Sequence, residues 1–362
     1  MIEETTAYEL LSSREGDRWN RLVESCESYD VFSLADYLAL YEQRGEGSAR
    51  LFVYEESSNR YVLYPFLLRD IPERVGGETY FDIITPYGYG GPLYSGRAAK
   101  NDLAFNRRFR ETFSRYCRLE GIVSEFIRFH PYQDNEQAIQ DHMVVSDVGD
   151  IVYNNLLLPE EDIWADTAPS KKRRIKKSKK NGVAVQFTEG TDVTAADIEM
   201  FHTMYTETMD KKHASPFYYF PLPFLNNYFQ ALAPYITLAW SIHDGQPVAA
   251  NLILKTGEFA TIHLSASVKE HLPLCPNCRL RYACILWAKE NGFTVLDHGG
   301  GKEKGDSLFA YKRQFSKNLL TYKTGKKIHL TDIYESLASR LPGRLERERA
   351  DFFPEYRKAA LH

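Results

Sequence analysis

The sequence predicts an α+β protein built from a duplicated unit, in which a mixed, mostly antiparallel sheet is flanked by helices. Two observations predict this fold class. An order of hairpin, strand, loop, long helix, glycine and strand occurs twice, ~170 residues apart. Three strands in a row before the one long helix also exclude a doubly wound nucleotide-binding fold, which places a helix after nearly every strand.

The elements of the first copy follow from periodicity and turn residues. Residues 1–50 are predicted to be helical because apolar residues recur there at helical spacing. Runs rich in Val, Tyr, Phe and Leu on either side of Ser57-Ser58-Asn59 predict a hairpin. The first copy therefore has predicted helices at 17–28 and 34–43, strands at 50–55, 60–69 and 80–85, a Gly- and Pro-rich loop at 86–92, a helix at 101–120 and a strand at 122–129.

The second copy repeats this order. The Asp244-Gly245 pair predicts a tight turn between two strands, and Gly292 predicts the end of the long helix. The predicted strands lie at 235–243, 246–255 and 259–268, followed by a helix at 277–291 and a strand at 294–298.

Length and composition predict a folded protein of about two domains, because the chain has 362 residues, 43% of them hydrophobic and 26% charged. No signal peptide or apolar run of ~18 residues is present, so a transmembrane segment is not expected. Five cysteines are too few for a disulfide framework, which favours a reducing cytoplasm. We expect a cytoplasmic protein, with peripheral contact to the inner membrane face as an open alternative.

The charge is unevenly distributed. Residues 171–180 contain eight Lys or Arg and no acid, although the whole chain has a net charge of −4. Eight cations in ten residues are expected to cover every face of a helix, and such a helix repels itself unless phosphates neutralise it. Nucleic acid or a phosphorylated lipid surface is therefore one interpretation, and a solvated helix face is the other.

The order of elements resembles the GNAT acyltransferase unit. Proteins of that type hold the coenzyme A pyrophosphate on backbone amides of a glycine-containing loop before the long helix. Here the corresponding residues 272–282 include Arg279 and Arg281 but no glycine. We therefore predict no cofactor, and a coenzyme A thioester remains the alternative acyl donor.

Three segments resemble the Fem family, which transfers amino acids from aminoacyl-tRNA to peptidoglycan precursors on two tandem GNAT-like domains. The segments are Gly299-Gly-Gly301 through Ala310-Tyr311-Lys312-Arg313-Gln-Phe315, the basic entry at 170–183 and the loop at 82–92. The sequence departs from the family in Gly90-Gly-Pro-Leu-Tyr-Ser95, which lacks the family's Arg and Asp, and in Tyr37-Leu-Ala-Leu-Tyr41, which lacks its phosphate-binding lysine. The departures leave the acceptor open.

The resemblance implies a domain organisation and a function. A first GNAT-like domain at 1–155 is completed by 317–345, a second at 156–316 holds the transfer site, and 346–362 form a C-terminal tail. The implied enzyme is an acyltransferase that moves an amino acid from aminoacyl-tRNA to an amine of a cell-wall precursor or related envelope acceptor. The alternatives are a coenzyme A-dependent N-acyltransferase and a non-catalytic RNA- or envelope-binding protein on the same fold.

The resemblance also implies site residues. Lys312, after the aromatic Tyr311, is placed beside the oxyanion of the tetrahedral intermediate; the alternative is a surface lysine in a basic strand with Arg313 and Lys317. The predicted donor-binding cations are Lys172, Arg173, Lys176, Lys177, Arg279 and Arg281. The predicted acceptor-binding residues are Tyr87, Tyr89, Tyr218 and Lys211.

Three other patterns have competing interpretations. His271, Cys275, Cys278 and Cys284 lie close in sequence, but without a second Cys pair they favour buried thiols over zinc, so no metal is predicted. Asp306 occupies the position where a P-loop needs lysine, which excludes ATP binding there. The aromatic segment 216–229 is predicted either to pack in the core or to form an acceptor-pocket wall or a lid at the membrane interface.

Overall fold

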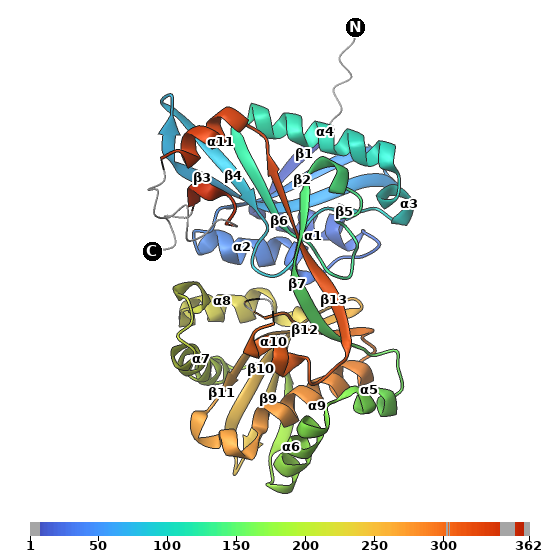
Figure 1. Cartoon of the computed structure of the whole chain (residues 1–362), viewed down its shortest axis with the longest axis vertical. Coiled ribbons are helices and arrows are strands. Elements are labelled where there is room, and N and C mark those ends of the chain that lie inside the picture. Colours follow the sequence, from blue (N-terminus) through green and yellow to red (C-terminus); the bar gives the residue numbers. More distant parts are fainter. Residues whose placement is uncertain (1–7, 302, 304, 341–351, 358–362) are drawn as a thin grey trace. The chain divides into compact units, whose positions relative to one another are not determined.

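The computed structural model describes residues 8–301, 303, 305–340 and 352–357 (Figure 1). The chain divides into two compact units, one formed by residues 1–148 with 323–362 and the other by residues 149–322. Each unit contains a mixed, mostly antiparallel sheet flanked by helices, so the predicted fold class is confirmed. Of the tail expected at 346–362, all but 352–357 lies outside the described residues.

The first unit begins with a strand that belongs to its sheet and with two helices. Its elements are β1 (Tyr8–Ser12), α1 (Gly16–Glu24), α2 (Ala35–Gln43), β2 (Ser48–Ser57), β3 (Arg60–Val75), β4 (Glu78–Ile84), β5 (Leu93–Tyr94), α3 (Arg97–Lys100), α4 (Leu103–Leu119), β6 (Ile122–Arg128), and, from the end of the chain, β13 (Asn318–Ile328) and α11 (Thr331–Ala338).

The second unit contains the remaining helices and strands, which follow β6 and precede β13 in the sequence. They are β7 (Val144–Asn155), α5 (Glu160–Asp166), α6 (Pro169–Lys180), β8 (Ala184–Glu189), α7 (Ala195–Lys211), α8 (Leu222–Ala231), β9 (Ile236–His243), β10 (Gln246–Thr256), β11 (Phe259–Ser267), α9 (Pro276–Glu290), β12 (Val295–Gly299) and α10 (Ser307–Lys312). The boundary strands β7 and β13 each begin in one unit and end in the other.

The two sheets have the same topology. In the first unit the strand order is β1-β2-β3-β4-β6, and in the second it is β8-β9-β10-β11-β12. Both sheets are antiparallel except for one parallel pair at the same place, β4 with β6 and β11 with β12. A long helix, α4 or α9, connects the strands of that parallel pair, as a crossover requires. The duplication inferred from the sequence is therefore present in the strand order.

Each sheet receives its last strand from a distant part of the sequence. β13 follows the second copy, yet its residues 324–328 pair antiparallel with β6 of the first unit. β7 follows β6 directly in sequence, yet its residues 152–155 pair with β12 of the second unit. α11 then packs on β3 and β6. The structural boundary of the first unit lies at Val148, where the sequence analysis placed it at 155.

The edge strands β1 and β8 were not predicted from the sequence, and neither were β5 and β7. Residues 1–50 are not entirely helical, because β1 pairs antiparallel with β2. β8 pairs in the same way with β9, at the equivalent edge of the second sheet. Both are edge strands of five or six residues with mostly exposed or half-buried side chains. Such strands lack the apolar content by which interior strands are recognised.

An ion pair is buried in the core of the first unit. Arg110 of α4 donates from both terminal nitrogens to the Glu125 carboxylate of β6, at 2.9 and 2.7 Å, and neither side chain is exposed. The Tyr64 hydroxyl and the His329 Nε2 bond the same carboxylate at 2.9 and 3.1 Å. Burial alone would raise the pKa of Glu125, but Arg110 and His329 outweigh it and hold the pKa below its ordinary value. Glu125 therefore stays ionised and connects α4, β3, β6 and the residue after β13.

Removing one partner of this pair should be costly. We expect Arg110→Met to lower the free energy of unfolding by about 3–5 kcal/mol, because Glu125 is left charged and buried. A matched control is Arg108→Met on the same helix, whose ion pair with Glu56 is exposed and whose loss should cost less than about 1 kcal/mol. Urea unfolding followed by circular dichroism measures both, and equal losses would contradict the account.

Candidate active site

Lys312 is the last residue of α10, a short helix capped by the Asp306 side chain, which accepts the Phe309 N–H at 2.7 Å. The Lys312 Nζ donates to the Gly300 carbonyl oxygen at 2.7 Å. Gly299 has a φ of +69°, and a Cβ there would lie 3.2 Å from this Nζ. Glycine at 299 therefore leaves room for the ammonium. Lys312 is partly buried on a helix, unlike the surface-strand lysine of the alternative interpretation.

The charge of Lys312 is destabilised by its surroundings. Burial and the nearby guanidinium of Arg281 lower the pKa of Lys312 from 10.5 to about 7, while Asp297 acts in the opposite direction. A lysine with this pKa populates both protonation states at neutral pH.

Arg281 of α9 lies in a buried polar chain. Its guanidinium donates to His298 Nδ1 at 2.8 Å, and His298 Nε2 donates to Asn154 Oδ1 at 2.6 Å. Burial, with Arg281 and Lys312 nearby, lowers the pKa of His298 well below its ordinary value, so the imidazole is neutral. Arg281 is thus held by a neutral acceptor. Its side chain is only 5% exposed, which places it inside the unit, apart from the exposed cations of α6.

Tyr311 lies between two cations. The Arg281 guanidinium is 5.5 Å from the Tyr311 ring centroid, and the Lys171 Nζ is 4.0 Å from it. Burial raises the pKa of Tyr311, so its hydroxyl remains protonated. Burial likewise lowers the pKa of Lys171, which is 2% exposed. The site therefore places two cationic groups, from α6 and α9, against the aromatic ring that precedes Lys312 in α10.

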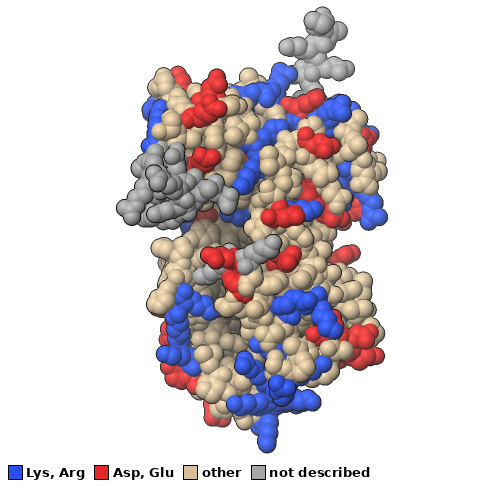
Figure 2. Space-filling model, viewed as in Figure 1, with Lys and Arg blue, Asp and Glu red and all other residues tan. Residues whose placement is uncertain are grey.

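The predicted donor-binding residues on α6 are mostly exposed, and Figure 2 shows Lys and Arg gathered over this helix. The cations do not cover every face, because Lys171, Ile175 and Ser178 form a buried stripe against α9. Lys172 is half-buried, and its Nζ donates to the Ala165 carbonyl oxygen at 3.2 Å. The exposed cations are Arg173, Arg174, Lys176, Lys177, Lys179 and Lys180. Arg279 is half-buried on α9.

The predicted acceptor-binding residues belong to different units. In the first unit, the Tyr37 hydroxyl donates to the Tyr87 carbonyl oxygen at 2.6 Å, and the Tyr89 ring meets His130 edge-on. In the second unit, Tyr218 accepts a hydrogen bond at its carbonyl oxygen from Tyr205, and Lys211 is exposed and paired with Glu207. Lys212, which directly follows α7, is the lysine whose charge acts on Lys312.

The aromatic segment at 216–229 is partly buried in the second unit, with three of its seven aromatic residues in the core. Phe220, Tyr228 and Phe229 are at most 3% exposed, whereas Phe217 is exposed. Within the described residues no helix is long and apolar enough to cross a membrane. Among the same residues no three His, Cys, Asp or Glu side chains are grouped so that they could hold a metal ion.

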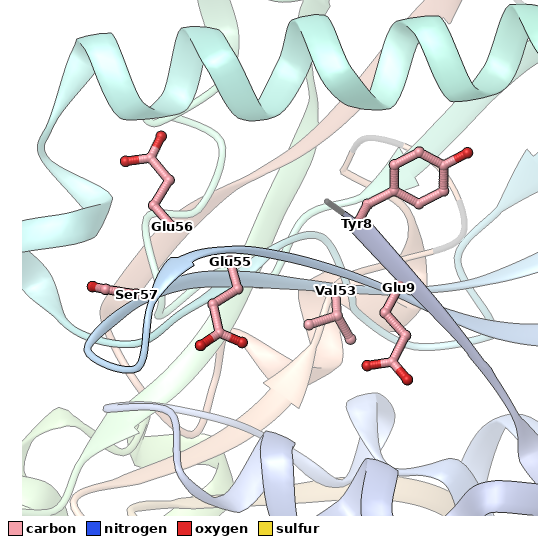
Figure 3. Close-up of a pocket in the computed structure, with 6 residues that line it drawn as sticks. All are labelled: Tyr8, Glu9, Val53, Glu55, Glu56 and Ser57. Atoms are coloured by element: carbon pink, nitrogen blue, oxygen red, sulfur yellow. The ribbon is translucent and has the colours of Figure 1, made fainter. Parts of the chain in front are cut away.

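An open pocket of about 360 Å³ lies in the first unit, beside β1 and β2. Figure 3 shows its residues, with Glu9 and Glu55 pointing the same way and Glu56 pointing towards α4. Its lining contains three carboxylates and none of the predicted site residues. An acidic lining disfavours phosphate, so this pocket does not fit a phosphate-bearing donor.

Four side chains of this site were not predicted from the sequence: Lys171, Asn154, Asp297 and His298. Lys171 was counted with the solvent-facing charge run, although its spacing to Ile175 and Ser178 marks one helix face. The others lie on β7 and β12, which pair in register Asn154 with Leu296. That pairing joins residues far apart in sequence, so no local pattern could have revealed it.

The lowered pKa of Lys312 predicts an effect on stability. The unfolded chain binds a proton on this lysine up to about pH 10.5 and the folded chain only up to about pH 7, so folding is opposed most below pH 7 and the penalty fades as the pH rises. We expect Lys312→Met to raise the stability at pH 6 by about 1–3 kcal/mol, less than the full shift because the side chain is partly exposed, and the gain to vanish near pH 10. Thermal unfolding across this range tests it, with the exposed Lys317→Met as control; a pH-independent difference would count against a buried ammonium.

The chain is similar to known proteins in sequence and in fold. Residues 169–313 match the family model of the acetyltransferase (GNAT) domain. No curated protein matches the sequence. The crystal structure of FemX is similar over 91% of this chain and 99% of its own, with a TM-score of 0.70 and 12% identity.

Two further structures share the fold. The C-terminal domain of a putative lysylphosphatidylglycerol synthetase from Agrobacterium fabrum is similar over 90% of this chain and 96% of its own, with a TM-score of 0.55 and 13% identity. L-PGS from Bacillus licheniformis is similar over 85% and 90%, with a TM-score of 0.57 and 13% identity. At these identities the similarity establishes the fold. The predicted resemblance to the Fem family is confirmed at that level, and the chain is an acyltransferase that carries a GNAT domain at residues 169–313 within a fold similar to that of FemX.

Proposed function

We propose that the protein transfers an aminoacyl group from aminoacyl-tRNA to an amine of a cell-wall precursor or related envelope acceptor. The observation that carries the proposal is the cationic site around Lys312. In this reaction the acceptor amine attacks the ester carbonyl and a negative charge develops on its oxygen. Lys312, with Arg281 close enough to lower its pKa, provides positive charge in a partly water-excluded position. The ester is already activated, so orientation and oxyanion stabilisation supply most of the catalysis.

The first turn of α9 supports a donor other than coenzyme A. Backbone amides at this turn hold the pyrophosphate in coenzyme A-dependent GNAT proteins. Here the first helical residue is Pro276, which has no N–H. The Cys275 N–H bonds the Leu272 carbonyl oxygen, and the Cys278 N–H bonds the Cys275 carbonyl oxygen. Few amides remain to meet a pyrophosphate at this turn.

The exposed cations of α6 support a polyanionic donor. Arg173, Lys176 and Lys177 are exposed on one helix, and no acid of the described residues pairs with them. The buried side of this helix packs on α9, which carries Arg281. A tRNA backbone bound along these cations would gain affinity by releasing counterions. The resemblance to the Fem family implies the same donor, and one structure of similar fold is named a putative lysylphosphatidylglycerol synthetase, which supports aminoacyl transfer.

The family model favours a second candidate, a coenzyme A-dependent N-acyltransferase, because its description is an acetyltransferase domain. The two candidates separate in one assay. The protein is incubated with labelled aminoacyl-tRNA or labelled acetyl coenzyme A and a set of amine acceptors, and the label is followed into the acceptor. Transfer from acetyl coenzyme A alone would refute the aminoacyl-tRNA proposal.

Lys312→Ala should slow single-turnover transfer by about 100- to 1000-fold, equivalent to about 2.7–4 kcal/mol, by analogy with the loss of one oxyanion donor. The variant should fold, because it removes a desolvated ammonium and the buried Asp297 still accepts the Gly299 N–H. Lys317→Ala is the control, since Lys317 is exposed and, among the residues that the structure describes, pairs with Asp166 alone. A wild-type rate in Lys312→Ala would refute the assigned role.

Donor binding should depend on salt through α6. If Arg173, Lys176 and Lys177 each neutralise one phosphate, changing all three to Ala should reduce the slope of log affinity against log salt by about 2–3. The matched control changes Arg107, Arg115 and Arg118, three exposed arginines of α4, to Ala. Filter binding of aminoacyl-tRNA between 50 and 300 mM salt measures the slopes, and an equal effect of both triple variants would show that α6 acts only through net charge.

A further inference from the structure

Two cysteines on the first turn of α9 have no role in the site described above. Cys275 precedes the helix and Cys278 is its third residue, in the sequence Cys275-Pro-Asn-Cys278. A zinc ion needs further ligands, and no suitable group of three occurs in the described part of the chain. Both cysteines are free thiols. The chemistry that remains open to this pair is thiol–disulfide exchange.

The backbone holds the two residues at a separation suited to a disulfide. The Cys278 N–H donates to the Cys275 carbonyl oxygen at 3.1 Å, which closes one turn between them. A four-residue turn closed in this way brings its first and last Cα atoms to less than about 7 Å apart, and a disulfide requires about 4.4–6.8 Å between Cα atoms. Side-chain rotation with a small shift of the turn can therefore join the sulfurs. Pro276 at the first helical position restrains this turn.

The two thiols differ in accessibility. Cys275 is half-buried, whereas Cys278 is 4% exposed. The other three cysteines, Cys26, Cys117 and Cys284, are all buried. An accessible thiol beside a buried one at a helix start is the arrangement of reversible Cys-x-x-Cys pairs, in which the first reacts with the oxidant and the second resolves it.

Cys278 also contacts the candidate active site. Tyr311 packs against the buried cluster that contains Cys278, and the Lys171 Nζ lies 4.0 Å from the Tyr311 ring centroid. Burial raises the pKa of the Cys278 thiol, while the Lys171 ammonium and the Tyr311 hydroxyl act in the opposite direction. Tyr311 precedes Lys312 in α10. A movement of the Cys278 sulfur therefore changes the packing of the Tyr311 ring, which Lys171 and Arg281 contact.

We propose that Cys275 and Cys278 form a reversible disulfide that switches the adjoining transfer site. The oxidant is a low-molecular-weight disulfide of the glutathione class. The Cys275 thiolate attacks one sulfur of the oxidant and releases one thiolate, and the Cys278 thiolate then attacks the Cys275 sulfur and releases the second. The two cysteines lose two protons and two electrons, and the oxidant is reduced to two thiols.

The new bond draws the Cys278 sulfur towards Cys275 and away from Tyr311 and Lys171. A displacement of about 1 Å near reacting groups can cost about 100-fold in rate, so transfer should slow by about 10- to 100-fold in the oxidised protein. This effect on rate rests on the proposed function, whereas disulfide formation does not.

The full chain is equilibrated with reduced and oxidised glutathione, alkylated and mapped by peptide mass spectrometry. In excess oxidised glutathione the peptide containing both cysteines should carry no alkyl group and weigh two hydrogen atoms less than the unmodified peptide. After reduction with dithiothreitol it should carry two alkyl groups. Cys278→Ser should instead trap glutathione on Cys275, because the resolving thiol is absent. Cys284→Ala, on the same helix, should behave as wild type. Absence of the intramolecular disulfide, or a disulfide between two chains, overturns the proposal.

Single-turnover transfer then tests the switch. The oxidised wild type should be slower and recover with dithiothreitol, whereas Cys275→Ser should be indifferent to the oxidant. An oxidised protein that transfers at the reduced rate overturns the switch. If the disulfide forms but neither redox state transfers from aminoacyl-tRNA, the proposed function fails while the redox pair stands, so the two failures are distinguishable.

Discussion

The second unit buries more positive than negative charge near α10, and its site depends on this imbalance. Lys171 and Arg281 approach the Tyr311 ring, Arg281 also acts on the next residue, Lys312, and Asp297 is the buried acid that acts on Lys312. Buried cations are costly unless they are paired. Aromatic faces, a carbonyl oxygen and a neutral histidine compensate them here only in part. An oxyanion that develops beside these groups would supply the missing counter-charge.

The duplicated fold shows how the imbalance arises. In the first unit the long helix α4 provides Arg110 and the following strand β6 provides Glu125, which pair in the core. In the second unit the corresponding helix α9 provides Arg281, and the corresponding strand β12 offers the neutral His298. In the first copy the arginine thus pairs with a carboxylate, whereas in the second copy it donates to a neutral imidazole. This difference explains why the candidate site lies in the second unit.

The sequence predicted the parts of the fold that depend on local pattern. Hairpin β2-β3, the strands β9 to β11 and the helices α4 and α9 follow from periodicity and from turn residues such as Asp244-Gly245. The edge strands β1 and β8 were missed because little of their surface is buried. The pairing of β7 with β12 was missed because nothing local specifies a partner 140 residues away. Lys312 came from a family resemblance, whereas its lowered pKa required the positions of Arg281 and Asp297.

The central claim is that the Lys312 ammonium is desolvated beside Arg281. Its pKa can be measured directly by NMR titration of lysine side chains labelled with ¹³C at Cε, with Lys312→Arg used to assign the signal. The structure predicts a midpoint near pH 7 that moves upward in Arg281→Gln, because one neighbouring positive charge is removed. A midpoint near 10.5, unchanged by that substitution, would contradict it.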